Sequence, residues 1–266
     1  MTDDAGAAGT LVGYRLVGAV AVLTLRRPES LNALSTPLTA ALAAAVRRVA
    51  GDPAARALVI AGEGRGFCAG ADLAEIESFR AAGEFGAFVG RLTATSALVE
   101  ELGKPSVAAV HGFALGGGLE LALACDLRVV EAGARLGLPE MKLGVLPGAG
   151  GTQRLPRVVP PGIARQMILT GEPVTAERAH EVGLANEVAP VGQVLPVALG
   201  LAEALARGAP LALAAGKRLL ADAGRPDLRS GIARERAAVT VLFDSSDRQE
   251  GLAAFRERRP GRFEGR

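Results

Sequence analysis

Two acidic residues lie beside glycine-rich turns in the middle of the chain. Glu120 follows a run of three glycines, Gly116–Gly118, and is flanked by leucines. Glu140 precedes a second glycine-rich turn at residues 147–151. A carboxylate in an apolar segment is costly to bury unless it is paired or protonated. The two side chains could therefore form an acid–base pair, in which one carboxylate activates water and the other, held protonated, donates a proton.

Each acidic residue also has a purely structural interpretation. A glutamate in the first turn of a helix interacts favourably with the helix macrodipole, which would account for Glu120 without any catalytic role. Glu140 could be an ordinary loop residue. The sequence spacing alone does not show that the two side chains meet, so both interpretations stay open.

A third candidate is the glycine-rich segment at residues 62–72, which joins a predicted strand to a predicted helix. Glycines let a ligand approach the main chain closely, and backbone N–H groups at a helix start can stabilise a developing anion. The segment matches neither the phosphate-binding loop nor the dinucleotide-binding fingerprint. Any glycine-rich turn has a similar composition, so taken alone the segment favours a structural loop.

Strands and helices alternate through the first part of the chain, and these elements must position the three segments. Short β-rich runs predict strands at residues 11–16, 20–25, 57–61, 106–110, 127–130 and 134–138. Capping and breaker residues predict helices at 37–50, 84–102 and 119–124, with Ser35 or Thr36 as the first N-cap, and a short helix from about Asp72. The later segments 163–169, 175–181, 195–206, 211–220, 232–243 and 248–257 are mostly helical. A layered α/β core followed by a helical C-terminal region is therefore predicted.

The composition indicates a globular protein and argues against several function classes. With 266 residues, 49% of them hydrophobic, the chain can bury a sizeable core. The 30 basic and 28 acidic side chains nearly cancel, so no strong field attracts nucleic acid. The apolar run 106–125 contains His111, Glu120 and three glycines, which argues against a membrane span. Residues 1–10 lack a signal-peptide pattern and predict a flexible tail, and two cysteines without a disulfide framework favour a cytoplasmic location.

The cysteines and histidines receive no catalytic role. Cys68 and Cys125 are interpreted as small core residues, because neither has a histidine nearby in sequence. His111 ends a predicted buried strand and is interpreted as a core histidine with its hydrogen bonds satisfied. His180 is expected to be exposed.

Together with residues 27–34, the segments at 62–72, 111–120 and 139–153 resemble the crotonase (enoyl-CoA hydratase/isomerase) superfamily. The resemblance extends over nearly the whole chain. It implies an α/β fold in which a repeated ββα unit forms a spiral core over residues 11–194. Residues 195–266 would then form a helical oligomerisation region, giving a homotrimer or a hexamer built as a dimer of trimers.

The resemblance also implies which residues react. The backbone N–H groups of Ala71 and Gly117 would form an oxyanion hole for a thioester carbonyl. Glu120 and Glu140 match the two catalytic glutamates of the hydratases. Many superfamily members with other reactions lack one or both acids, so the presence of both is the most discriminating feature.

Further positions are implied to contact CoA or substrate. They are Ser30, Leu31, Ala69, Gly70, Asp72, Gly148, Phe255 and Arg258. Ala69 and Gly70 would line the site for the adenine end of CoA, and Gly148 would bring main chain near the catalytic water. Phe255 and Arg258 would reach the CoA of a neighbouring subunit, although Arg258 stands where some family members have lysine.

The implied activity is that of a lyase, the syn addition of water to a trans-2-enoyl-CoA to give a 3-hydroxyacyl-CoA. The resemblance implies no metal and no cofactor beyond the CoA of the substrate. One alternative is a 3-enoyl to 2-enoyl-CoA isomerase, which needs the same oxyanion hole but only one acid. Another is a noncatalytic RNA-binding member. Its only candidate surface is the arginine-rich tail, which is more typical of a solvated or subunit-contacting surface, so neither a nucleic acid nor a membrane is expected as a partner.

Overall fold

The computed structural model describes residues 10–224 and 226–266, so the expected tail at residues 1–10 lies outside the described residues except for Thr10. Within the described residues, a six-stranded sheet has the order β1-β2-β3-β4-β6-β9. Its strands are β1 (Val12–Val17), β2 (Val20–Leu25), β3 (Ala57–Gly62), β4 (Ser106–Val110), β6 (Leu127–Glu131) and β9 (Glu187–Ala189). β1 and β2 form an antiparallel hairpin, and the strands from β2 onward pair in parallel.

The side chains of the central strands alternate between two apolar clusters, as the two-residue period of a strand requires. In β3, Leu58 and Ile60 face one cluster, whereas Ala57, Val59 and Ala61 face the other. All five side chains are buried. A sheet buried on both faces explains why these strands read as nearly continuous apolar runs in the sequence.

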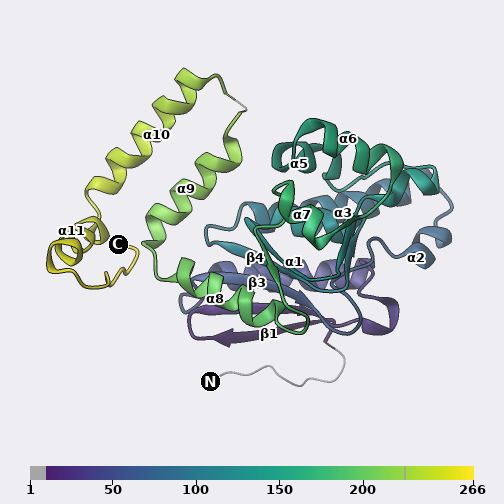
Figure 1. Cartoon of the computed structure of the whole chain (residues 1–266), viewed down its shortest axis with the longest axis horizontal. Helices are drawn as coiled ribbons and strands as arrows, with labels where there is room; N and C mark the ends of the chain where they lie inside the picture. Colours follow the sequence, from purple (N-terminus) through teal and green to yellow (C-terminus); the bar gives the residue numbers. More distant parts are fainter. Residues whose placement is uncertain (1–9, 225) are drawn as a thin grey trace.

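Helices cover both faces of this sheet (Figure 1). α1 (Thr36–Gly51) and α3 (Ala82–Glu100) contribute buried side chains to the first cluster. α8 (Val194–Ala206) covers the opposite face with Ala198, Ala202 and Ala206, which lie four residues apart on one side of the helix. These small side chains let α8 lie close to the strands.

A second sheet of three strands, within the described residues, consists of β5 (Phe113–Leu115), β7 (Arg135–Gly137) and β8 (Val174–Thr175). β5 follows β4 and β7 follows β6, so each of these strand pairs passes from the large sheet to the small one. β5 and β7 are parallel, with Leu115 opposite Gly137. The segments that follow them therefore leave the sheet side by side.

Two isolated parallel bridges connect the loops around this small sheet: one reaches β5 itself, and the other joins two loops of the N-terminal half. Cys68 pairs with Ala114, and Leu34 pairs with Ala71. As a result, the loops that precede α1, α2, α4 and the segment after β7 lie next to one another at a single edge. The glycine-rich segments singled out in the sequence meet there.

Short helices connect the strands. They are α2 (Leu73–Ser78), α4 (Gly117–Ala124), α5 (Gly151–Val158), α6 (Pro161–Thr170) and α7 (Ala176–Glu181), with 3-10 helices η1 (Pro28–Ser30) and η2 (Pro139–Leu143). Every residue of α4 is buried. An apolar helix that is buried all round is typical of the centre of a core.

The last three helices, α9 (Pro210–Asp222), α10 (Leu228–Phe243) and α11 (Ser246–Glu257), form an arm that stands away from the core (Figure 1). Neither α9 nor α10 buries any of its described residues. Polar contacts attach the arm: Lys217 Nζ lies 2.8 Å from Asp126 Oδ2, and Arg56 donates to Phe263 O at 2.8 Å. Arg56 also donates to Gly208 O, just before α9, at 2.7 Å. We call residues 210–266 the C-terminal arm.

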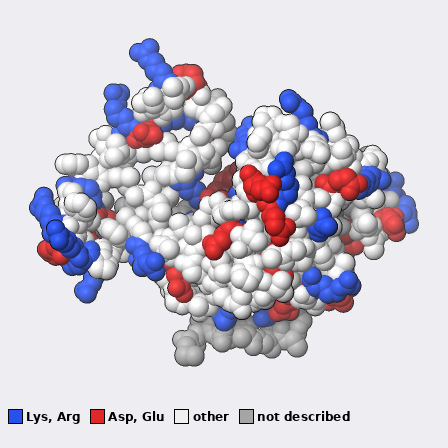
Figure 2. All heavy atoms as spheres, in the orientation of Figure 1, with Lys and Arg blue, Asp and Glu red and all other residues white. Residues whose placement is uncertain are grey.

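Charges of both signs are interspersed over the face of the core drawn in Figure 2. Basic side chains gather at the end of the molecule formed by α11. Several of them are neutralised locally, since Arg259 pairs with Glu250 and Glu257, and Arg266 pairs with Glu264.

The predicted α/β architecture is confirmed, and most predicted elements are present within a few residues of their expected ends. The short strands β5, β8 and β9 were not predicted. The region expected to begin at residue 195 includes α8, which packs on the sheet as part of the core, so the separate arm starts only at α9. Residues 106–125 form β4, β5, α4 and the turns between them rather than one long helix.

No single helix in the described part of the chain has the length and apolar character needed to cross a membrane. α8 and α9 pass that test only when they are taken together, and they are bent by 110° relative to each other.

Candidate active site

Glu120 and Glu140 lie on the segments that follow the paired strands β5 and β7. Glu120 is in the first turn of α4, and Glu140 is in the 3-10 helix η2. The amide of Gly116 donates to the carbonyl oxygen of Gly137 at 2.9 Å, which joins the two segments immediately before they reach the glutamates. The parallel pairing of two short strands thus brings together two acids that are 20 positions apart in sequence.

The carboxylate of Glu120 is buried and held by main-chain donors. Its Oε1 accepts hydrogen bonds from Ala149 N at 2.8 Å and from Gly151 N at 2.7 Å, and the residue is only 2% exposed. Burial raises the pKa of Glu120, while the two amide donors and the positive charge of Arg154 oppose this rise because they stabilise the ionised form.

Glu140 is half-buried and has a different environment. Among the described residues, its Oε2 is enclosed by protein and has no hydrogen-bond partner. Its Oε1 lies 3.1 Å from the position that a Cβ atom would take on Gly116. Burial raises the pKa of Glu140 to about 7, and the negative charge of Glu120 adds to this effect. Glu120 therefore has donors and a positive charge that stabilise its ionised form, whereas both burial and the charge of Glu120 oppose ionisation of Glu140.

The backbone amides of Ala71 and Gly117 lie close to each other. A Cβ atom built on Gly117 would be 3.5 Å from Ala71 N, and one built on Gly70 would be 3.5 Å from Gly117 N. In the β-bridge between Leu34 and Ala71, the two hydrogen bonds are formed by Gly70 O and Asp72 N. The N–H of Ala71 itself takes no part in this bridge and points away from Leu34. Gly117 is the first residue of α4, and its N–H has no intrahelical acceptor.

Gly70 and Gly116 make this approach of two backbones possible. Both have positive φ, at 110° and 50°, which side chains other than glycine rarely tolerate. A Cβ atom on Gly70 would lie 2.9 Å from the carbonyl oxygen of Leu115. Glycine at both positions is therefore required by the geometry.

A buried asparagine joins the N-terminal loop to the loop before α2. Asn32 accepts from Arg27 N at 2.9 Å and donates to the carbonyl oxygens of Glu63 at 2.8 Å and Gly66 at 3.0 Å. It is fully buried and has a left-handed backbone, with φ of 56°. Sequence reasoning did not single it out, although asparagine is one of the few residues that tolerate this conformation.

The structure places the predicted CoA contacts in two groups. Ser30 and Leu31 lie against the loop that carries Ala69 and Gly70, and Ala69 N donates to Leu31 O at 3.0 Å. Asp72 lies beside them, but its buried carboxylate forms an ion pair with Arg27 and caps α2 by accepting from Glu75 N at 3.1 Å. The carboxylate of Asp72 is thus already engaged within the protein.

Gly148 lies in the turn that supplies the donors to Glu120. Its carbonyl oxygen accepts from Thr93 Oγ1 at 3.3 Å, which connects this turn to α3. Phe255 and Arg258 belong to the distal end of the C-terminal arm, and Phe255 is 84% exposed. In Figure 1, helix α11, which carries Phe255 and is capped by Arg258, lies at the far end of the arm from the core.

Sequence reasoning missed the residues that hold Glu120, namely the amides of Ala149 and Gly151 and the side chain of Arg154. The glycine-rich turn was noted, but main-chain donors leave no side-chain signal. The interpretation of the cysteines is confirmed, since Cys68 and Cys125 are free and buried. His180 is exposed as expected, and His111 is half-buried with Nε2 3.0 Å from Gly64 O.

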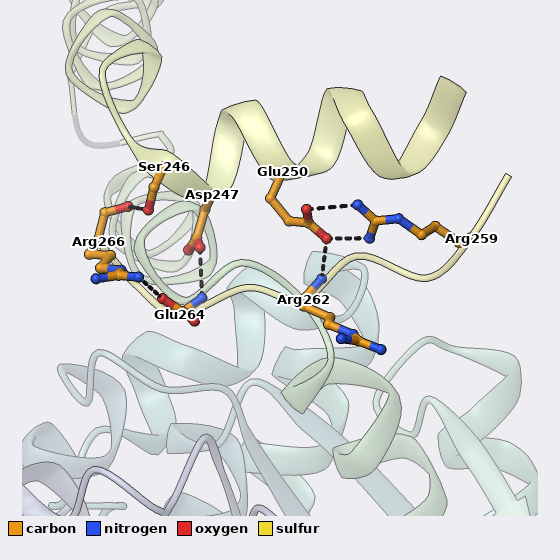
Figure 3. Close-up of a pocket in the computed structure, with 7 residues that line it drawn as sticks. All are labelled: Ser246, Asp247, Glu250, Arg259, Arg262, Glu264 and Arg266. Atoms are coloured by element: carbon orange, nitrogen blue, oxygen red, sulfur yellow. Dashed lines mark hydrogen bonds and ion pairs between the residues drawn. The ribbon is translucent and has the colours of Figure 1, made fainter. Parts of the chain in front are cut away.

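A surface hollow elsewhere on the molecule lies between α11 and the C-terminal segment (Figure 3). Its lining is strongly charged, and several of the charges are already engaged: Arg259 contacts both carboxylate oxygens of Glu250, and Asp247 accepts from Glu264 N at 2.7 Å. This hollow belongs to the folding of the arm, and it is separate from the edge that carries the two glutamates. Within the described residues, no three His, Cys, Asp or Glu side chains are arranged as metal ligands.

Comparison with solved structures defines the class of fold. The chain superposes on an enoyl-CoA hydratase from Bacillus anthracis with a TM-score of 0.93 and 36% identity, covering 96% of this chain and 100% of that one. It also matches an enoyl-CoA hydratase from Polaromonas sp. JS666 with a TM-score of 0.91 and 35% identity, covering 95% and 99% of the two chains. The molecule therefore has the crotonase fold.

Comparison of sequences gives the family. A family model described as enoyl-CoA hydratase/isomerase matches residues 16–266. The 2,3-dehydroadipyl-CoA hydratase of Escherichia coli is 43% identical over 93% of this chain and 96% of its own length. The crotonyl-CoA hydratase of Syntrophomonas wolfei is 39% identical over 92% and 94%, respectively. The chain belongs to the enoyl-CoA hydratase/isomerase family, and it is an enzyme of that general type.

Proposed function

We propose that this enzyme is an enoyl-CoA hydratase, which adds water in the syn sense to a trans-2-enoyl-CoA and gives a 3-hydroxyacyl-CoA. The observation that carries the proposal is the convergence of Glu120 and Glu140 in unlike environments. An isomerase needs only one acid to move a proton, whereas hydration needs a base for water and an acid for carbon. The two relatives described above that are named as hydratases support the same choice.

In this proposal, the thioester carbonyl oxygen binds between the amides of Ala71 and Gly117. Two N–H donors that point at one position stabilise the negative charge that develops as the enolate forms. A well-aimed donor of this kind contributes about 3 kcal/mol to transition-state stabilisation. Gly117 adds the positive end of the α4 dipole to the same position.

Glu120 and Glu140 then divide the proton transfers. Water attacks C3 of the enoyl group while ionised Glu120 accepts one of its protons, and protonated Glu140 delivers a proton to C2. The new bonds are C3–O and C2–H, and the pair returns to its starting state by passing one proton from Glu120 to Glu140. The enclosed Oε2 of Glu140 is available for this role because it has no partner among the described residues.

The substrate is proposed to be an acyl-CoA thioester whose acyl chain lies toward α3. Val89 of α3 approaches the turn that donates to Glu120, because a Cβ on Gly148 would lie 3.0 Å from its Cγ1. The named relatives differ in acyl group, one acting on a dicarboxylic and the other on a short monocarboxylic thioester by their descriptions. A panel of 2-enoyl-CoA substrates of increasing length, with and without a terminal carboxylate, would define the preference.

The assay that tests this function follows the absorbance of the conjugated enoyl thioester. Addition of the pure enzyme to crotonyl-CoA should decrease this absorbance as the double bond is hydrated. If the enzyme instead left crotonyl-CoA unchanged and produced conjugated absorbance from a 3-enoyl-CoA, it would be an isomerase.

The two glutamates provide the first mutational test. Glu120→Gln and Glu140→Gln should each reduce kcat for hydration by at least about 100-fold, because each removes one proton-transfer group, while CoA binding is retained. CoA affinity measured by calorimetry is the control. Near wild-type turnover in either variant would contradict the two-acid mechanism.

We further propose that the enzyme assembles as homotrimers, which can pair into hexamers, and that each CoA site is completed by a neighbouring subunit. The exposed arm supports this proposal: Leu228, Val241 and Phe255 are 80%, 76% and 84% exposed in the single chain. Phe255 and Arg258 would then contact the CoA of the neighbour. A cytoplasmic location and the absence of a separate cofactor likewise stay predictions.

A further inference from the structure

Arg154 contacts the turn that holds the carboxylate of Glu120. It lies in the first turns of α5, and its Nη1 donates to Ala149 O at 2.8 Å. The amide of the same Ala149 donates to Glu120 Oε1 at 2.8 Å. The carbonyl that Arg154 binds therefore lies between the two amides, those of Ala149 and Gly151, that bind Glu120.

The guanidinium group of Arg154 lies directly on the backbone of Gly150. A Cβ atom on Gly150 would overlap Nη1 of Arg154, and Gly150 has a φ of 109°. Glycine is thus required at this position both by its conformation and by the arginine above it. The turn and the side chain fit together as one unit.

A carboxylate on a different helix fixes the other end of the guanidinium. Arg154 Nη2 lies 2.8 Å from Glu100 Oε2 at the end of α3, and the side chain of Arg154 is only 14% exposed. Its Nε is buried and has no partner among the described residues, so the two terminal nitrogens make its contacts. An arginine held at both terminal nitrogens has little freedom to turn.

We propose that Arg154, held in place by Glu100, is a positioning residue that fixes the 149–151 turn and so orients the Glu120 carboxylate for reaction. Arg154 does not touch the reacting atoms. Its role in catalysis rests on the proposed hydration. Its effect on the position and pKa of the Glu120 carboxylate is independent of the reaction. The chain of contacts runs from α3 through Glu100, Arg154 and Ala149 to Glu120.

Arg154 also carries the positive charge that acts on Glu120. The other charged group facing the site is Glu140 of η2, and Glu100 of α3 faces Arg154 itself. Loss of the arginine charge leaves the burial of Glu120, which favours the protonated form, opposed by the two amide donors without the help of a positive charge. The pKa of Glu120 should then rise. As pH falls, the ionised form that accepts the proton from water should therefore be lost at a higher pH than in the wild type.

The test compares Arg154→Met and Arg154→Lys with Arg157→Met as a matched control. Arg157 is exposed on the same helix, and among the described residues its side chain donates to the carbonyl oxygen of Gln153 and forms no ion pair. Arg154→Met should lower kcat by about 10- to 100-fold, as expected for a misplaced catalytic group, with little change in KM. The acidic limb of its pH profile should move to higher pH. Arg154→Lys should restore the position of that limb but only part of kcat, because it keeps the charge and loses the two-pronged contact.

A measurement without substrate separates this inference from the proposed function. Titration of the Glu120 carboxyl carbon by NMR, with the resonance assigned from Glu120→Gln, should show a higher pKa in Arg154→Met than in the wild type or Arg157→Met. This result would support the inference even if the enzyme hydrated no enoyl-CoA. If Arg154→Met did not fold, Glu100→Gln and Arg154→Lys would test the positioning alone: both keep the positive charge, so each should lower kcat without moving the Glu120 titration. Wild-type kcat together with an unshifted Glu120 titration in Arg154→Met, or wild-type kcat in both Glu100→Gln and Arg154→Lys, would overturn it.

Discussion

The proton carried by Glu140 should make the activity depend on pH near neutrality. Its pKa is raised to about 7, so the protonated form that donates to C2 is lost as pH rises through that value. The value of kcat/KM should fall about tenfold per pH unit above it, and this limb should be absent from Glu140→Gln. A kcat/KM that stays constant from neutral to alkaline pH in the wild type would contradict the assignment of Glu140 as the acid.

At the scale of single residues, the sequence identified the acids but not their environments. Glu120 and Glu140 stood out because each lies beside a glycine turn, and the resemblance matched both to known catalytic positions. Their unlike environments depend on main-chain donors from residues 149–151 and on a positive charge from Arg154. Contacts of this kind depend on the backbone path, which residue types alone do not specify.

Helix α4 carries Gly117 and Glu120, and its close approach to the loop before α2 requires Gly118. A Cβ atom on Gly118 would overlap the carbonyl oxygen of Cys68, and both segments are buried. Gly118→Ala should therefore destabilise the fold by about 1–3 kcal/mol, because neither backbone has space to move. Urea denaturation measures this change.

Gly90 of α3, unlike Gly118, has space around it for a side chain. No atom lies within 4 Å of a Cβ built there, and the position is exposed. Gly90→Ala should stabilise the protein by roughly 1 kcal/mol through helix propensity alone. Equal effects of the two substitutions would contradict the packing described for α4.

Arg128 donates hydrogen bonds to carbonyl groups at the C-terminal end of α4. Its side chain donates to Cys125 O at 2.9 Å and to Leu184 O at 2.7 Å, and the residue is 5% exposed. Arg128→Met should lower the free energy of unfolding by roughly 2–3 kcal/mol, because buried carbonyl groups lose charged donors. Arg15→Met, at an exposed position of β1, should leave it nearly unchanged.

At the scale of elements, the long and strongly patterned segments were predictable and the short ones were not. β4 was predicted with the bounds that the structure shows, because all five of its residues are buried and the four after Ser106 are apolar. β5 and β7 contain three residues each, too few to show a period, and β5 was missed. Yet the pairing of these two strands is what brings Glu120 and Glu140 together, so the sequence could not show that the acids meet.

At the scale of the whole molecule, the C-terminal arm exposes large apolar side chains in the single chain, and in the proposed trimer a neighbouring subunit would cover them. Val241→Asp on α10 should therefore shift the protein from trimers toward monomers and weaken substrate binding, since the arm would no longer dock. Analytical ultracentrifugation measures the change in mass. Val191→Asp, at a position 75% exposed compared with 76% for Val241, is the matched control outside the arm. A wild-type protein that sedimented as a monomer would contradict this proposal.

The burial of Cys68 affects whether a bound thioester can transfer its acyl group to the protein. This residue lies three positions before Ala71, is fully buried, and donates its thiol hydrogen toward Asn32 O at 3.1 Å. Burial raises the pKa of its thiol to about 12. At neutral pH only about one molecule in 100,000 would then carry a thiolate there. An acyl group bound beside this loop is therefore protected from exchange onto the protein's own sulfur, and the product can leave still attached to CoA.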